Sequence, residues 1–447
     1  MAYQGKTRLD SNRGRIFAAD GERAPARRAL LAGLATSAVL VVLVPAGSVR
    51  ADGPGTSWIR FDGRPVDNVA TQSYDRRFVR QWEANPPRGY PTLSKKNIEA
   101  TRDAIERYRA IVKAGGWRAV PGDQLEVGMF ANAVRVLQER LLVSGELRGE
   151  AAATGYFDYE TERAVKRFQA TNGLTPTGIV DLRTLTAMNV PATARMRQLQ
   201  INLDRLRSAV ESGERRYVVV NIPAAQIEAV EDDRVVSRHS GVVGKRERQT
   251  PVLTSSIHEL NFNPVWRLPP TVVTKDLIPK GREMQRAGQN VLLQFGIDAY
   301  SGDRKLDPKK IDWNSSQPYG LSYRQQAGEH NPLGFVKINF HNNYSVYLHD
   351  TPSDRLFGRN FRAASSGCVR VENIETLISW LLRDTNRWGL DDIQAIKMSG
   401  ETKTIRLKRA VPLKMLYLTA WATEDGVVQF RRDLYGRDGV GQLASNY

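Results

Sequence analysis

The chain has 447 residues, of which 41% are hydrophobic, and its formal net charge is +17. A chain of this length and composition can bury two or three hydrophobic cores, which excludes a wholly disordered protein. The single cysteine excludes an internal disulfide, and the scattered histidines lack the spacing of metal ligands. No glycine-rich phosphate loop precedes a helix. We therefore expect no metal and no other cofactor.

Residues 1–51 predict an export signal or a signal anchor. A basic stretch at residues 23–28 precedes an apolar run at residues 29–44, and small residues follow up to Ala51. This order is typical of a secretory signal, and the apolar run is shorter than the roughly 20 residues of a membrane span. We expect a protein of the periplasm or cell envelope, exported by the Sec or twin-arginine route. It has a membrane anchor if the signal is not cleaved.

The positive charge is dispersed along the chain. A net positive charge often indicates that a protein binds nucleic acid. An exported protein meets little nucleic acid, so we expect no nucleic-acid partner. Peptidoglycan, with its free peptide carboxylates, is the better polyanionic partner. The alternative is a solvated basic surface without a ligand.

The fold class predicted is a multidomain α+β protein. Residues 52–120 predict a helical scaffold, whose helix at 97–113 ends at Gly115 and Gly116. A small helical domain is predicted over residues 121–191, with helices at 130–142, 159–172 and 182–188. Another helix, at 192–210, leads to a β-rich region over residues 215–447.

Strands are predicted in the β-rich region at 217–222, 226–230 and 235–244. The pattern then lapses at 274–331 into helical and loop stretches, an insertion of the kind that often forms a lid. Strands resume at 335–340 and 344–349, and the intervening asparagines favour a hairpin. A second hairpin is predicted within residues 410–437.

The segment 344–349 presents a histidine on a polar face. Alternation places Val346 and Leu348 on one side and Ser345, Tyr347 and His349 on the other. A lone histidine is more often structural than catalytic, and we interpret four others in this way: His239, His258, His330 and His341.

Cys368 lies in a turn of small residues, SSGCVR, followed by an amphipathic helix. Gly367 leaves room for an acyl group, and the N–H groups of Ser366, Gly367 and Cys368 could converge on an oxyanion. We expect His349, Arg370 and the following helix end to lower the thiol pKa below its free value of about 8.5. Ser365 or Ser366 as nucleophile offers no advantage over the neighbouring thiol.

These residues resemble the signature of the L,D-transpeptidases of the catalytic-cysteine (YkuD) type, a histidine at a strand end followed by Ser-x-Gly-Cys-x-Arg. Further segments resemble the large, envelope-resident branch of that family: GKRERQTP, LNFNPVWRLPP, NPLGFVKINF and NNYSVYLHDTP. The helical segment YFDYETERAVKRFQATNGLTPTGIVDLRTLTAMN is similar to the peptidoglycan-binding repeat found beside many wall enzymes.

The resemblance implies that Cys368 attacks the third residue of a tetrapeptide stem, expels D-alanine and passes the acyl group to an amine, which forms a 3-3 cross-link. It implies His349 as general acid and base and Ser366 with Gly367 as the oxyanion turn. Ser366 replaces a common histidine and Asp350 a common glycine, and we favour a backbone carbonyl as the group that orients His349. Substrate contacts are expected from Arg370, Tyr347, Asn331 and Trp266, and less strongly from Tyr323 and Arg324.

The sequence does not determine which acceptor takes the acyl group from Cys368. Water would give an L,D-carboxypeptidase, and a lipoprotein lysine would give a lipoprotein-attaching transferase. A non-catalytic peptidoglycan-binding scaffold is the rival outside the enzymes, although it needs neither Cys368 nor His349. Expected partners are peptidoglycan stem peptides and glycan, and other wall-synthesis enzymes.

Overall fold

The computed structural model describes residues 90–148, 153–210, 214–385 and 388–439. The predicted export segment, residues 1–51, lies outside the described residues, as does the part of the predicted scaffold before residue 90. Among the residues that are described, no helix is both long enough and apolar enough to cross a membrane.

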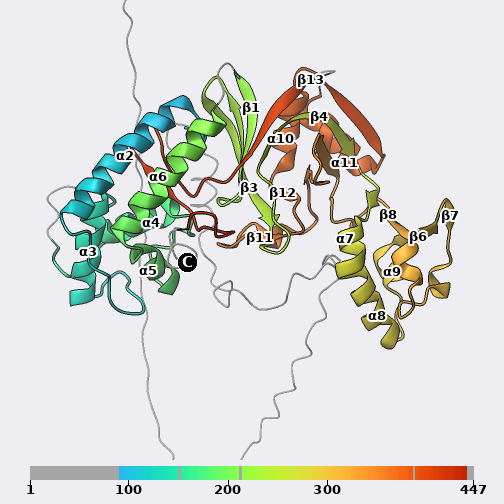
Figure 1. Cartoon of the computed structure of the whole chain (residues 1–447), viewed down its shortest axis with the longest axis horizontal. Coiled ribbons are helices and arrows are strands. Elements are labelled where there is room, and N and C mark those ends of the chain that lie inside the picture. The colour runs from blue at the N-terminus through green and yellow to red at the C-terminus, as the bar shows by residue number, and fades with distance from the viewer. Residues whose placement is uncertain (1–89, 149–152, 211–213, 386–387, 440–447) are drawn as a thin grey trace, which may run out of the picture. The chain divides into compact units, whose positions relative to one another are not determined.

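Two long helices pack against each other and against the C-terminal hairpin (Figure 1). Helix α2 (Lys95–Lys113) begins where the Ser94 side chain accepts a hydrogen bond from the Asn97 N–H, which satisfies a main-chain donor left open at a helix start. Helix α6 (Ala192–Ala209) lies alongside it. Their shared core contains Ala104, Ile105, Tyr108, Leu199, Leu203 and Phe430.

The small helical domain has its own core. Helices α3 (Asn132–Ser144), α4 (Tyr159–Thr171) and α5 (Leu182–Met188) surround buried Val134, Leu137, Val165, Phe168 and Val180. Asp158 and Asp181 cap α4 and α5 by accepting the N–H groups three residues ahead. Each of these three helices lies within two residues of its predicted bounds.

The β-rich region forms a nine-stranded sheet in the order β11-β3-β12-β10-β9-β4-β13-β1-β2. Strand β2 also pairs with β3, which closes the sheet on itself. The strands are β1 (Arg216–Asn221), β2 (Gln226–Glu231), β3 (Arg234–Gly244), β4 (Leu253–Phe262), β9 (Val336–Phe340), β10 (Leu348–His349), β11 (Ala363–Ser365), β12 (Val369–Val371) and β13 (Lys403–Leu416).

One face of the central strands forms the main core. Leu260, Ile338, Leu348 and Val369 are fully buried in it, and helix α10 (Ile374–Leu382) packs on the same core. Helix α11 (Leu390–Ser399) contacts α10. The opposite face of β10 and β12 is therefore the one that carries polar side chains.

The insertion, predicted at 274–331, forms a folded subdomain together with residues 266–273 before it, rather than a set of loops (Figure 1). Its helices are α7 (Pro270–Val272), the π-helix η3 (Val273–Leu277), α8 (Ile278–Arg286) and α9 (Val291–Phe295), with the 3-10 turns η4 (Pro308–Lys310) and η5 (Gln317–Gly320). It also has a four-stranded sheet, which the predicted pattern of helices and loops missed: β5 (Trp266–Arg267), β8 (Ser322–Gln325), β6 (Ile297–Ser301) and β7 (Arg304–Lys305). β5 and β7 have only two residues each, and the alternation of β6 is confined to the two apolar residues Ile297 and Ala299.

Two predicted hairpins are corrected. The predicted strand over 344–349 is regular only at Leu348–His349, because Ser345 has a left-handed backbone with φ 56° and Asn342 accepts the N–H groups of Tyr344 and Val346. The C-terminal hairpin comprises only β14 (Ala420–Ala422) and β15 (Val428–Phe430). Residues 413–416 instead extend β13 within the main sheet, where they pair with β1 and β4.

Candidate active site

The strand register places three polar residues in one row. Two of them, His349 and Arg370, were predicted from the sequence, and the third, Lys337, was not. His349 lies opposite Arg370 in the parallel pairing of β10 with β12, and opposite Lys337 in the antiparallel pairing of β10 with β9. Residues paired across strands share a face of the sheet, and Leu348 with Val369 occupies the core face. Lys337, His349 and Arg370 therefore lie together on the polar face.

Tyr347 holds the Cys368 thiol. Both the main-chain N–H and the hydroxyl of Tyr347 hydrogen-bond the thiol, and Val369 N–H donates to the Tyr347 carbonyl at 3.0 Å. The Trp266 ring N–H donates to the Tyr347 hydroxyl at 3.2 Å. The Lys337 Nζ lies 4.4 Å from the centroid of the same tyrosine ring. Cys368 is thus held by two hydrogen bonds from Tyr347 while it remains partly exposed.

His349 is oriented by main-chain carbonyls, as favoured from the sequence. Its Nδ1 lies 2.5 Å from the carbonyl oxygen of Asp350, and the Pro332 carbonyl also contacts the ring. A carbonyl can only accept, so the neutral ring carries its proton on Nδ1 and has its lone pair on Nε2. The Asp350 carboxylate points elsewhere and accepts the Phe335 N–H at 3.0 Å.

Burial and the two cations keep His349 neutral. Burial lowers the pKa of His349 to about 3, with Arg370 and Lys337 adding to the lowering. Its ring centroid lies 5.6 Å from that of Tyr347. No hydrogen bond joins it to Cys368 among the described contacts, an arrangement common in active sites without substrate.

The expectation of a lowered thiol pKa is wrong for this state of the protein. Burial raises the pKa of the Cys368 thiol, and the bonds from Tyr347 and the charges of Lys337 and Arg370 lower it by less. The following helix contributes little, because strand β12 separates Cys368 from the start of α10 at Ile374. The resting site therefore holds a neutral thiol beside a neutral imidazole.

The turn before the cysteine depends on Gly367. Its φ of 118° is a conformation that side-chain-bearing residues rarely adopt. Its N–H donates to Ser365 Oγ at 3.1 Å, so this group is not available for the oxyanion role predicted for it. The N–H groups of Ser366 and Cys368 stay as candidates, since neither has an acceptor among the main-chain bonds of the described residues.

Arg248 joins this turn to the insertion. Its guanidinium binds both carboxylate oxygens of Asp276, at 2.5 and 3.0 Å, and also donates to Ser366 Oγ at 2.8 Å. Asp276 belongs to η3, within the insertion, and both members of the ion pair are largely buried. A bidentate, shielded pair of this kind is stronger than an exposed one.

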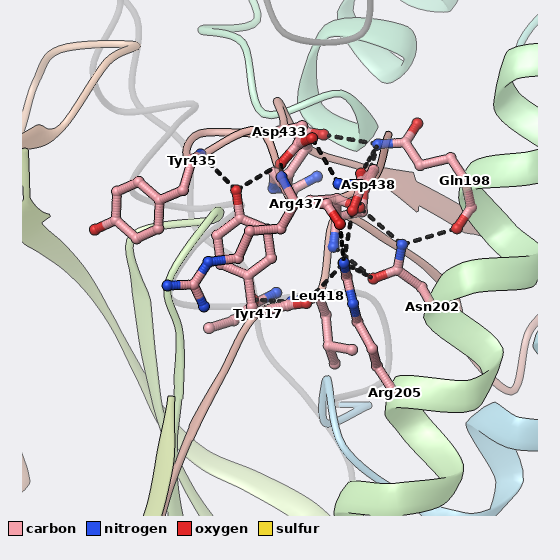
Figure 2. A network of polar contacts seen from close by, with 12 residues as sticks. Gln198, Asn202, Arg205, Tyr417, Leu418, Asp433, Tyr435, Arg437 and Asp438 are labelled. Atoms are coloured by element: carbon pink, nitrogen blue, oxygen red, sulfur yellow. Dashed lines mark hydrogen bonds and ion pairs between the residues drawn. The ribbon is translucent and has the colours of Figure 1, made fainter. Parts of the chain in front are cut away.

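A buried polar network supports the turn from the other side. Tyr435 donates through its hydroxyl to the Gly244 carbonyl at 2.7 Å and accepts the Thr250 N–H at 3.1 Å. Figure 2 shows Tyr435 linked through Tyr417 and Asp433 to Asp438, which binds Arg205 of helix α6. Continuous hydrogen bonds thus run from α6 to the residues that hold the cysteine turn.

The predicted substrate contacts fare differently. Arg370 lies in the row with His349, Tyr347 bonds the Cys368 thiol, and Trp266 donates to the Tyr347 hydroxyl. Asn331 is fully buried, and its side chain is bound to the main chain of Pro264, Gln326 and Leu333, which gives it a structural role. Two weaker candidates, Tyr323 and Arg324, belong to β8 of the insertion.

Sequence reasoning missed three residues of this site: Lys337, Arg248 and Thr250. Lys337 had a detectable signal, because it alternates with Val336 and Ile338 on an apolar strand. Arg248 and Thr250 lie in the segment GKRERQTP that carries part of the family resemblance, but nothing in this loop indicated that the fold brings these two residues to the cysteine turn. His239 is buried and bound to Glu372 O and Ser237 Oγ, in line with its structural interpretation.

Comparison with known proteins supports the resemblance. Residues 215–394 match the YkuD family, described as "L,D-transpeptidase catalytic domain", and residues 131–188 match "Putative peptidoglycan binding domain". A Haemophilus influenzae protein named "Putative L,D-transpeptidase" is 32% identical over 249 residues, which are 55% of this chain and 49% of that protein. The chain thus spans about half the length of this curated relative.

Two crystal structures of L,D-transpeptidases are also similar to the chain. The one from Xylanimonas cellulosilytica is 17% identical, covers 66% of this chain and 98% of its own, and has a TM-score of 0.22. The one from Stackebrandtia nassauensis is 14% identical, covers 67% and 96%, and has a TM-score of 0.26. With TM-scores this low, the two structures carry no argument about the family of this chain.

The family match shows that the chain contains a YkuD-type L,D-transpeptidase catalytic domain over residues 215–394, in which His349 and Arg370 pair on one sheet face. It combines this catalytic domain with a small helical domain of the peptidoglycan-binding kind. Membership in the large, envelope-resident branch stays a prediction.

Proposed function

We propose that the protein is a cysteine-dependent L,D-transpeptidase that forms 3-3 cross-links between peptidoglycan stems. The observation that carries the proposal is the environment of the Cys368 thiol. Tyr347 hydrogen-bonds the thiol, and the charges of Lys337 and Arg370 act on it. The neutral His349 of the same site has its lone pair on Nε2. The peptidoglycan-binding domain and the YkuD match agree with this substrate.

The first half-reaction forms a thioester. Cys368 gives its proton to His349 Nε2, and the thiolate attacks the carbonyl carbon of the third stem residue. Lys337 and Arg370 favour the charged sulfur, and the N–H groups of Ser366 and Cys368 can donate to the oxyanion. The C–N bond to the terminal D-alanine then breaks, and the leaving amine takes the proton back from His349.

The second half-reaction transfers the acyl group. The amine of a neighbouring stem attacks the thioester carbonyl and loses a proton to His349 Nε2 as the C–S bond breaks. The Cys368 thiolate leaves and recovers that proton, so the site returns to its starting state with a new amide formed. Closure of the insertion over the site, held through Asp276 and Arg248, would exclude the water that competes with this amine.

The acceptor distinguishes the alternatives. Transfer to water gives an L,D-carboxypeptidase, and transfer to a lipoprotein lysine gives a lipoprotein-attaching enzyme. A scaffold without activity is the remaining alternative. The buried Arg248–Asp276 pair beside the cysteine turn favours a shielded site and hence an amine acceptor over water.

The decisive test incubates the protein with a disaccharide-tetrapeptide and follows the products by mass spectrometry. We expect D-alanine release and a cross-linked dimer from the wild type, and neither from Cys368→Ser. A carbapenem should add once, at Cys368. Tripeptide alone would indicate the carboxypeptidase, and D-alanine release by Cys368→Ser near the wild-type rate would contradict the cysteine mechanism.

We further propose that the protein works in the periplasm or cell envelope, on the basis of the basic and apolar segments within residues 1–51. Fusing these residues to a phosphatase that is active only after export would test the proposal, with residues 52–89 as the control. An inactive fusion of residues 1–51 would contradict it.

A further inference from the structure

The carboxylate of Asp350 belongs to the residue after His349, and no step of the proposed reaction uses it. The Asp350 main-chain N–H donates to the Val336 carbonyl at 3.0 Å, so the chain still runs beside β9 at this point. The half-buried carboxylate accepts the main-chain N–H of Phe335, at 3.0 Å, and that of Thr351. A charged acceptor binds such donors more strongly than a neutral one, so this side chain holds two segments of the main chain.

One peptide group links the carboxylate to the imidazole. The group between Asp350 and Thr351 donates its N–H to the Asp350 carboxylate, and its carbonyl oxygen lies 2.5 Å from His349 Nδ1. A peptide group is planar, so its N–H and its C=O cannot turn independently. The hydrogen bond of the N–H therefore sets the direction of the carbonyl to which the imidazole donates.

The second donor ends a turn that also contacts the imidazole. The turn begins at Asn331, whose side chain donates to main-chain carbonyls outside it, and its Pro332 carbonyl contacts the His349 ring. The Asp350 carboxylate fixes the other end of the turn through the Phe335 N–H. Both carbonyls that contact the imidazole therefore belong to segments that this carboxylate holds.

The turn packs directly on the carboxylate at Gly334. This glycine has a left-handed backbone with φ 60°, and a Cβ built on it would lie 2.1 Å from Asp350 Oδ2. Only a residue without a side chain fits there. The carboxylate thus supports the turn by van der Waals contact as well as by a hydrogen bond.

The Asp350 carboxylate is charged at neutral pH. Burial raises the pKa of Asp350 to about 6, whereas the N–H groups of Phe335 and Thr351 lower it. Two charged side chains act on it from neighbouring helices: Glu375 of α10 raises the pKa, and Lys397 of α11 lowers it. Because Lys397 Nζ lies 2.6 Å from Glu375 Oε1, these two charges largely cancel.

We infer that Asp350 is a positioning residue, whose carboxylate fixes the two carbonyls that set the tautomer and the direction of the His349 ring. The inference rests on the proposed function, in which His349 Nε2 takes the proton of the Cys368 thiol. A carbonyl that turned away would let the imidazole carry its proton on Nε2, where it could not accept another from the thiol. Asp350 acts on the reaction only through these main-chain groups.

The test compares Asp350→Ala, which removes the acceptor, with Asp350→Asn, which keeps one acceptor oxygen in nearly the same place. Glu375→Gln is the control, because it removes a neighbouring carboxylate and leaves the acceptor of the Phe335 and Thr351 N–H groups unchanged. Nitrogen NMR of the full chain with labelled histidine reports which imidazole nitrogen carries the proton, and His349→Gln identifies the signal. Rapid mixing with a carbapenem at several concentrations separates the acylation rate at saturation from the half-saturating concentration.

We expect the Nδ1–H form of His349 in the wild type and the control, and a substantial Nε2–H population in Asp350→Ala. Acylation at saturation should be at least about tenfold slower in Asp350→Ala, with the half-saturating concentration unchanged, because a misplaced base with the wrong tautomer is a poor proton acceptor. Asp350→Asn should recover most of the Nδ1–H form and of the rate. If melting shows that Asp350→Ala is unfolded, Asp350→Ser replaces it, since its hydroxyl ends one bond short of the carboxylate oxygens.

An unchanged tautomer in Asp350→Ala, or equal slowing by Glu375→Gln, overturns the inference. The NMR measurement does not depend on turnover, and the reaction of the wild type with the carbapenem is measured separately. A tautomer change in Asp350→Ala together with a wild type that is never acylated would therefore contradict only the proposed function.

Discussion

Thr250 binds the cysteine turn directly, since its hydroxyl donates to the Gly367 carbonyl at 2.8 Å. The same hydroxyl accepts the Gly244 N–H at 2.8 Å, so one buried oxygen joins the end of β3 to the turn. Tyr435 binds the Thr250 main chain and extends this support to the C-terminal segment. The turn is thus placed by residues that contact neither the thiol nor its histidine.

Replacing Thr250 with valine should slow acylation of Cys368 by a carbapenem about tenfold, because small displacements of a nucleophile are costly. Loss of the hydroxyl also leaves two buried main-chain groups without partners, at about 1–3 kcal/mol each. The rate is measured by intact mass over time. Thr250→Ser keeps the hydroxyl and should react near the wild-type rate; equal slowing in both variants would contradict a role for this bond.

Lys337 should influence the thiol through its charge. It lowers the pKa of Cys368, against the larger effect of burial, so Lys337→Met should move the pH profile of thiol alkylation to higher pH. Iodoacetamide labelling followed between pH 6 and pH 10 measures the profile. Lys337→Arg keeps the charge and should leave the profile close to that of the wild type, whereas an unchanged profile in Lys337→Met would refute the charge effect.

Breaking the Asp276–Arg248 pair should loosen the contact between the insertion and the cysteine turn, and so open the lid that we propose. We expect Asp276→Asn to shift products from cross-linked dimer toward hydrolysed tripeptide, while Cys368 is still acylated, because water then competes better with the amine. Chromatographic dimer-to-tripeptide ratios provide the measurement. Lys280→Gln is the control, since it removes an exposed ion pair with Glu283 in the same insertion. An unchanged ratio in Asp276→Asn would show that this pair does not hold a lid.

His239 should make the protein less stable in acid. Burial lowers its folded-state pKa to about 4, so the unfolded chain binds the extra proton between about pH 6.5 and pH 4. Its contribution to the free energy of unfolding is complete above that window and is lost as the pH falls, by about 1.4 kcal/mol per pH unit. His349 acts in the same sense, and Asp350, with a pKa raised to about 6, acts in the opposite sense.

The difference between wild type and His239→Gln isolates this contribution. Urea unfolding at several pH values between 4.5 and 7 should give a shallower loss of stability in the variant, by about 1.4 kcal/mol per pH unit. Glutamine keeps the capacity to bond Glu372 O and Ser237 Oγ, so the fold should survive. Parallel curves for the two proteins would show that His239 does not titrate in this range.

Much of the site was predictable because its signals are local. The turn with Gly367 and Cys368, and the alternation that ends at His349, are short-range patterns that dictate backbone conformation and side-chain direction. The capped helices α4 and α5 were predictable for the same reason, since Asp158 and Asp181 precede apolar positions at helical spacing.

The sequence by itself therefore determined the candidate nucleophile, its candidate histidine and the helices of the small domain. The tertiary structure decided the rest. Register between β9, β10 and β12 set Lys337 and Arg370 on either side of His349, and burial raised rather than lowered the thiol pKa. Loop residues such as Thr250 and Arg248 reached the turn only through strand pairing between distant segments. The bonds of these two loop residues to the turn join positions more than a hundred residues apart, and no local pattern encodes them.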